Sequence, residues 1–170
     1  MVRESGDRTK PAAMTGILKL VLFRIDDLRL AVPLGSVERT VRMVALTPLP
    51  SAPEIIRGMV NCQGALVPVA DLRARLSLPT REPAPEDRLL IVRAPKRLLG
   101  LIADHVDGVA TIDERDLMAP ELIHPSLAGC AGAAALPDGV LLIVDMESFL
   151  AADEERSLER ALGSGEEAGA

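Results

Sequence analysis

The stretch LVLFRIDDLRLAVPLGSV, residues 20–37, occurs a second time in altered form as LLIVRAPKRLLGLIADHV, residues 89–106. The two copies align at a constant offset of 69 residues, which places Val37 on Val106. A constant offset of this kind indicates an internal structural repeat. Both copies contain two apolar runs, rich in strand-forming residues, on either side of a short polar turn. This pattern predicts a β-hairpin in each copy.

A second aligned block follows in each copy. LVPVADLRARL, residues 66–76, aligns with VLLIVDMESFL, residues 140–150, at an offset of 74 residues. The change of offset fits an insertion in a loop between the blocks. Each copy therefore predicts three strands, a loop, a second hairpin and a helix. A unit of this size buries little apolar surface alone, so we expect the two units to pack against each other.

Turn-forming residues separate the predicted strands. A first proline cluster at 48–53 marks a loop because proline cannot donate to a strand ladder. Gln63 and Gly64 predict a tight hairpin turn, in which glycine supplies the backbone freedom. A second proline cluster at 79–87 is the predicted linker between the copies. The predicted strands are residues 18–25, 28–32, 37–44, the two arms of 57–69, 88–93, 98–103, 106–112 and 140–144.

The end of the chain has a different composition. From about residue 146 to residue 162 it contains strong helix formers and no proline or glycine, which predicts a helix. Asp71 and Asp145 each precede a predicted helical segment and are expected to cap it. The final GSGEEAGA is typical of a free tail, and residues 153–170 carry much of the negative charge, as a solvated helix does.

Composition excludes several classes of protein. The chain has 170 residues, of which 48% are hydrophobic and 26% charged, so it is a globular chain rather than a disordered one. Phe23 and Phe149 are the only aromatic residues, too few for a platform that stacks nucleic-acid bases or sugars. With 25 acidic and 19 basic residues the net charge is -6, which disfavours nucleic-acid binding.

Membrane insertion, metal binding and catalysis are also not expected. No apolar run approaches the roughly 18 residues that span a bilayer, and no signal sequence is recognisable, so we expect a cytosolic protein. Cys62 and Cys130 are far apart and have no paired histidines, so neither a zinc site nor a disulfide framework is predicted. His105 and His124 are the only histidines, and HExxH, GxSxG and the phosphate-binding loop motif are absent. We therefore expect no enzyme and no cofactor.

One string of residues resembles a known family. The pattern I-x-G-x-x-N-x-x-G-x-x-x-P-V-x-D-L is similar to that of the CheW-like domain of bacterial chemotaxis, and the resemblance extends over residues 17–151. Its matching residues are Ile56, Gly58, Asn61, Gly64, Pro68, Val69, Asp71 and Leu72.

The resemblance implies an all-β fold of two pseudo-repeated, five-stranded SH3-like β-barrels packed together, with short helices, a C-terminal helix and a hydrophobic groove between the barrels. This agrees with the repeat found above. The expected boundaries are a flexible N-terminus (1–16), a first barrel (about 17–78), a linker (79–87), a second barrel (about 88–151) and an acidic helical extension with its tail (152–170). Exchange of strands between the barrels is left open.

The function that the resemblance implies is that of a non-enzymatic adaptor. Such a protein couples the cytoplasmic tip of methyl-accepting chemoreceptors to the regulatory domain of a CheA-type histidine kinase, and other CheW-like proteins join the same array. We expect no cofactor, no metal and no nucleic acid. The expected location is the cytoplasm, at membrane receptor arrays reached through these partners.

Partner contacts are carried over by position. The expected contact residues are Val37, Arg39, Gly58, Asn61, Gln63, Gly64 and Val106. Structural roles for them stay open: the valines fit a core, the glycines fit turns, and asparagine readily caps its own turn. Two positions depart from the family pattern, which has an acidic residue at Arg39 and an arginine at Gln63. We hypothesise that these departures adapt the choice of partner, with neutral drift as the alternative.

Two further functions stay open at this point. A small molecule could bind in the cleft between the barrels of a sensing module, although few polar residues are available to hold it. A CheW-like modulator could bind the receptor or the kinase alone and so limit the array.

Overall fold

The computed structural model describes residues 16–119, 130–137, 139–147 and 149–169. Residues 1–15 of the N-terminus (1–16), which was predicted to be flexible, lie outside the described residues. His124 also lies outside them. The strands are β1 (Ile17–Ile25), β2 (Leu28–Pro33), β3 (Val37–Arg42), β4 (Ile56–Cys62), β5 (Ala65–Ala70), β6 (Arg88–Arg93), β7 (Leu98–Ala103), β8 (His105–Asp113), β9 (Leu117–Met118), β10 (Cys130–Leu136) and β11 (Gly139–Val144). The helices are α1 (Leu72–Arg75), α2 (Ala152–Gly169) and the short 3-10 turns η1 (Leu34–Ser36) and η2 (Glu114–Asp116).

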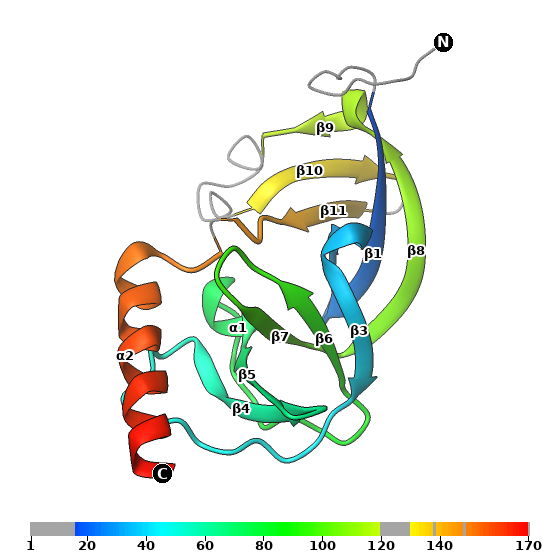
Figure 1. Ribbon diagram of the computed structural model, residues 1–170. Helices are drawn as coiled ribbons and strands as arrows, with labels where there is room; N and C mark the ends of the chain where they lie inside the picture. Colours follow the sequence, from blue (N-terminus) through cyan, green and yellow to red (C-terminus); the bar gives the residue numbers. More distant parts are fainter. Residues whose placement is uncertain (1–15, 120–129, 138, 148, 170) are drawn as a thin grey trace.

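The strands form two sheets, which occupy the upper and lower parts of Figure 1. The six-stranded sheet has the order β8-β1-β2-β11-β10-β9, and the five-stranded sheet has the order β3-β6-β7-β5-β4. The two orders are equivalent under the sequence repeat, apart from the two-residue β9. In each sheet the central contact is parallel, between β2 and β11 or between β7 and β5. The prediction of a mostly β fold with two repeated units is therefore confirmed.

Each sheet contains strands from both copies of the repeat. The first hairpin of one copy pairs with the third strand and second hairpin of the other. As a result, β3 joins β6 and β8 joins β1, and we call β3 and β8 the exchange strands. Both sheets thus take strands from either side of the proline-rich linker at 79–87. The two units cannot be separated at this linker without breaking both sheets.

Three apolar clusters hold this arrangement together. A central cluster lies between the sheets and includes residues of β1, β2, β6, β7 and α2. A second cluster belongs to the five-stranded sheet, and a third belongs to the six-stranded sheet. Alternation along one strand supplies two of them, since Leu90 and Val92 of β6 enter the central cluster while Leu89 and Ile91 enter the second.

The second copy differs from its prediction at its end. We predicted a helix from about residue 146, but α2 begins at Ala152 and runs to Gly169. Met146 and Phe149 are instead buried in the central cluster, which requires a turn before the helix. Asp145 caps that turn, accepting a hydrogen bond from the backbone N–H of Glu147 at 3.0 Å. The predicted cap at Asp71 is confirmed, because its carboxylate accepts from the N–H of Arg73.

Helix α2 packs along the body of the protein, beside β4 and α1 in Figure 1. Leu158 and Ala161 are fully buried in the central cluster. Its acidic residues form ion pairs with the body: Arg75 with Glu154, and Arg97 with Glu155 and Glu159. Much of the helix charge is thus neutralised within the chain. In the described part of the chain, no helix is long and apolar enough to cross a membrane.

Candidate partner-binding surface

The β4–β5 hairpin presents three of the expected contact residues at its tip. Gln63 and Gly64 form the two-residue turn with φ angles of 54° and 90°, as a primed turn between antiparallel strands requires. Asn61 accepts a hydrogen bond at its Oδ1 from the Gly64 N–H at 2.8 Å. Asn61, Gln63 and Gly64 are all exposed. The asparagine therefore caps its own turn, and its neighbours remain open to a partner.

Gly58 has a structural role inside the first unit. Its φ is 153°, and a Cβ at this position would lie 2.8 Å from the carbonyl oxygen of Thr47. The next residue, Met59, exchanges two backbone hydrogen bonds with Thr47, at 2.7 and 2.9 Å. Only glycine allows the segment after β3 to lie this close to β4. Gly58 is buried, so it can influence partner binding only indirectly, through the shape of the segment after β3.

Val37 and Val106 occupy equivalent places on the two exchange strands. Val37 of β3 faces Val92 of β6, and Val106 of β8 faces Phe23 of β1. Phe23 and Val92 are themselves aligned in the sequence repeat. Both valines are partly buried and pack against the central cluster. Each valine therefore contributes to the core and also has an exposed part, so both roles left open by the sequence, core residue and partner contact, fit it.

Arg39 lies apart from the hairpin tip in the sheet order. It is exposed on β3, at one edge of the five-stranded sheet, whereas Gln63 follows β4 at the other edge. Neither side chain makes a hydrogen bond or ion pair with a described residue. Of the expected contact residues, the structure thus groups Asn61, Gln63 and Gly64 in the hairpin and places Val37 and Val106 on one core.

A group of charged side chains around the buried Arg73 joins the two sheets, and sequence reasoning did not identify it. Arg73 of α1 donates to both Asp26, at 2.8 and 2.9 Å, and Asp104, at 3.0 and 3.1 Å. Asp26 is in the β1–β2 turn of the six-stranded sheet, whereas Asp104 directly follows β7 of the five-stranded sheet. We call these three residues the clamp. Arg81 of the linker extends it, donating to Asp104 at 2.7 Å and to Asp87 at 3.0 Å.

In the clamp and its extension, the pKa values of Arg73 and Asp87 are shifted. Hydrogen bonds to Asp26 and, after the opposing effect of burial, to Asp104 raise the pKa of Arg73. Burial is the largest influence on Asp87 and acts to raise its pKa. The bonds from Arg81 and from the Ala84 N–H nevertheless lower that pKa overall. Arg73 and Asp87 are therefore charged at neutral pH, and the ion pairs of Arg73 with Asp26 and Asp104 connect the two sheets.

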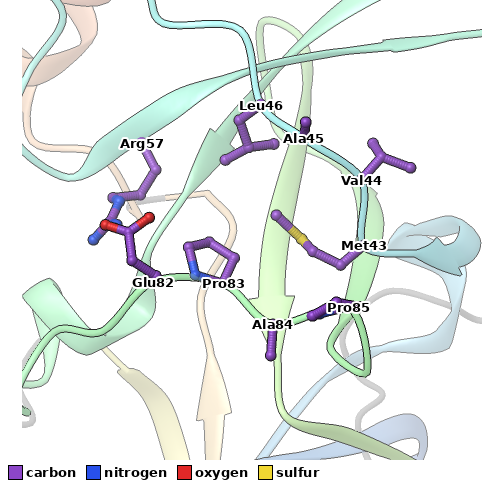
Figure 2. A pocket seen from close by; sticks show the side chains of 9 residues that line it. All are labelled: Met43, Val44, Ala45, Leu46, Arg57, Glu82, Pro83, Ala84 and Pro85. Atoms are coloured by element: carbon purple, nitrogen blue, oxygen red, sulfur yellow. The ribbon is translucent and has the colours of Figure 1, made fainter.

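A pocket of about 400 Å³ opens between the segment after β3 and the linker. Figure 2 shows Met43 pointing into this space, with Arg57 and Glu82 side by side at one end. Arg57 also donates to Asp71 at 3.2 Å, so its charge is already compensated. The pocket is lined by Met43, Val44, Ala45, Leu46, Arg57, Glu82, Pro83, Ala84 and Pro85. The Gly58 contact described above holds one wall of it in place.

Comparisons with known proteins agree with this architecture. The model of the CheW-like domain family matches residues 19–154. The chemotaxis protein CheW of Rhizobium meliloti is 26% identical over 141 residues, which cover 82% of this chain and 91% of the relative. Protein FrzA of Myxococcus xanthus is 34% identical over 116 residues, covering 68% and 72%.

A solved structure gives the same result. The crystal structure of the scaffolding protein TtCheW from Thermoanaerobacter tengcongensis is similar with a TM-score of 0.72 and 28% sequence identity. The similarity covers 81% of this chain and 94% of that chain. With the family model matching most of its length and with the repeated two-sheet fold, this chain belongs to the CheW-like domain family.

Proposed function

We propose that this chain is a non-enzymatic adaptor that couples methyl-accepting chemoreceptors to a CheA-type histidine kinase in a bacterial chemosensory array. The observation that supports it most is the pair of equivalent exchange strands. They offer two related surfaces, around Val37 and around Val106, on a single body. An adaptor needs two such surfaces, because it must hold two partners at once.

The relatives support the same function. Similar proteins are named chemotaxis proteins, and the similar solved structure is named a scaffolding protein. We further propose that the contact residues are Val37, Arg39, Gly58, Asn61, Gln63, Gly64 and Val106, with Gly58 acting through the shape of its neighbours. In this role the chain would lie at the cytoplasmic tips of receptors, held there by its partners, which can include other CheW-like proteins.

Reconstitution tests the adaptor function. The purified chain is mixed with a receptor signalling fragment and with the kinase carrying its regulatory domain. Co-sedimentation and kinase autophosphorylation are then measured. We expect all three proteins to sediment together and the kinase to become receptor-dependent. Binding of one partner alone, without kinase activation, would instead indicate the single-partner modulator and contradict the adaptor.

The departures at Arg39 and Gln63 can be tested in the same assay. The variant Arg39→Glu with Gln63→Arg restores the family pattern of charge. We expect it to change the relative affinities for receptor and kinase fragments from different chemosensory systems. Arg156→Gln on α2 is the matched control, since it makes the same change in net charge and Arg156 is exposed and makes no ion pair with a described residue. Equal preferences in all three proteins would show that the departures are neutral.

A further inference from the structure

A second pocket lies where the five-stranded sheet meets the start of β8. Its volume is about 550 Å³. It is lined by Arg42, Pro85, Glu86, Arg88, Asp104, His105 and Val106. We call it the basic pocket, because two arginines and a histidine contribute to its wall. Val106 places it next to one of the two proposed contact surfaces.

Arg42 and Arg88 are directly opposite each other in the pocket. They are paired residues of neighbouring strands, Arg42 at the end of β3 and Arg88 at the start of β6. Like charges in this cross-strand position repel each other and destabilise a sheet. Within the described part of the chain, neither guanidinium makes a hydrogen bond or an ion pair. The repulsion between them is therefore not relieved inside the described structure.

Among the described arginines near the two sheets, the lack of a partner is unusual. Most other arginines near the two sheets bind a carboxylate: Arg24, Arg57, Arg73, Arg81, Arg93 and Arg115. Two carboxylates do lie on the wall of the basic pocket. Asp104, however, is engaged by the clamp and by Arg81, and Glu86 is exposed and pairs with neither arginine. Positive charge is thus left uncompensated in a chain whose net charge is -6.

We propose that the basic pocket receives carboxylate side chains from an acidic segment of a partner protein. This rests on the proposed adaptor function and specifies the chemistry of one partner. Two adjacent guanidiniums offer forked donors that match a carboxylate and hold it strongly where water is partly excluded. The pocket continues into the surface at Val106, so a segment bound there brings its side chains within reach.

The experiment compares binding with stability. The variant Arg42→Gln with Arg88→Gln removes both positive charges and leaves neutral, polar amide groups in their place. Affinities for the receptor signalling fragment and for the kinase regulatory domain are measured separately by calorimetry, at low and at high salt. We expect roughly tenfold weaker binding of one of these partners, together with a smaller dependence on salt. The thermal midpoint of the free variant should stay the same or rise, because the repulsion is gone.

A matched control separates the pocket from net charge. Arg156→Gln with Arg160→Gln removes two exposed arginines of α2 and makes the same change in total charge. We expect this control to bind both partners as the wild-type chain does. Equal weakening in the control and in the pocket variant would overturn the proposal in favour of a general charge effect. A variant that binds less and also melts earlier would overturn it as well, by assigning the arginines a structural role.

The outcomes distinguish this proposal from the adaptor function. If the wild-type chain binds neither partner, both fail together. If it binds both and the pocket variant has unchanged affinities, only the basic pocket proposal fails. Titration with inorganic phosphate tests the alternative that the basic pocket binds a small anion. Binding of phosphate that the pocket variant loses, with partner affinities unchanged, would assign the pocket to a small anion and overturn the proposal.

Discussion

The two exchange strands occupy equivalent places but carry opposite charge. β8 carries Asp107 and Asp113, and both form ion pairs with arginines of the chain itself. Hydrogen bonds from Arg115 lower the pKa of Asp113 to about 2. β3 carries Arg39 and Arg42, which have no such partners among the described residues. The only other charged residue of β3, Glu38, is paired with Arg93. The repeat thus preserved the pairing of strands, whereas the charge diverged: both carboxylates of β8 are paired within the chain, and the two arginines of β3 are not paired with any described residue.

The largest expected loss of stability is at the buried residues that pair with the exchange strands, and it differs between the two strands. Phe23 faces Val106, and the aligned Val92 faces Val37; both are fully buried. We expect Phe23→Ala to lower the free energy of unfolding by about 4 kcal/mol, and Val92→Ala by about 2 kcal/mol, because the smaller side chain leaves a smaller cavity. Urea unfolding followed by circular dichroism measures both. Equal losses of stability would mean that packing at the two positions contributes equally, which would contradict this expectation.

The clamp provides a second test of the difference between the exchange strands, since it connects the β1–β2 turn to the residue before β8. In Arg73→Met, the carboxylates of Asp26 and Asp104 remain together without their shared cation. We expect a loss of about 2 kcal/mol in the free energy of unfolding, less than for a fully buried pair because Asp26 is 47% exposed.

A double-mutant cycle checks this expectation. Adding Asp26→Asn to Arg73→Met removes the repulsion between the carboxylates, so the double variant should be more stable than the two separate losses would give together. Strictly additive losses, measured by urea unfolding, would show that Arg73 does not act through these carboxylates.

The smallest expected loss of stability comes from the ion pair of Asp107 on β8. Asp107 pairs with Arg24 at 3.0 Å, and both side chains are well exposed. Asp107→Asn leaves Arg24 of β1 unpaired and removes one of the two negative charges of β8. We expect a loss of only about 0.5 kcal/mol in the free energy of unfolding, which 1 M salt should largely remove. A loss well above 1 kcal/mol that salt does not change would contradict the view that this pair is a solvated one.

Most strands could be predicted from the sequence because both faces of the sheets are buried. The predictions for 88–93 and 98–103 coincide with β6 and β7. By contrast, β10 reads CAGAAAL and lacks branched and aromatic residues, so only the repeat implied a strand there. The predicted helix began at about residue 146 because of composition, but burial of Phe149 overrides that preference before Ala152. Local propensity therefore failed where packing in the central cluster decides.

The hairpin tip was predictable, whereas the charged sites were not. Asn61 and Gly64 belong to one short motif whose turn chemistry can be read locally. The residues of the clamp and of the basic pocket are far apart in the chain and meet only through the register of β3 with β6 and the exchange of strands. No local pattern marks Arg42 as the neighbour of Arg88.

The division of the chain between the sheets also sets an order for its synthesis. Every strand of the five-stranded sheet has been made once the ribosome passes Ala103. The six-stranded sheet lacks β11, and therefore a parallel neighbour for β2, until Val144 has been added. The β1–β2 hairpin is made first but waits longest for its neighbours, with apolar edges open in the meantime. For a nascent chain of this kind, the N-terminal hairpin is the part that most needs protection from premature association.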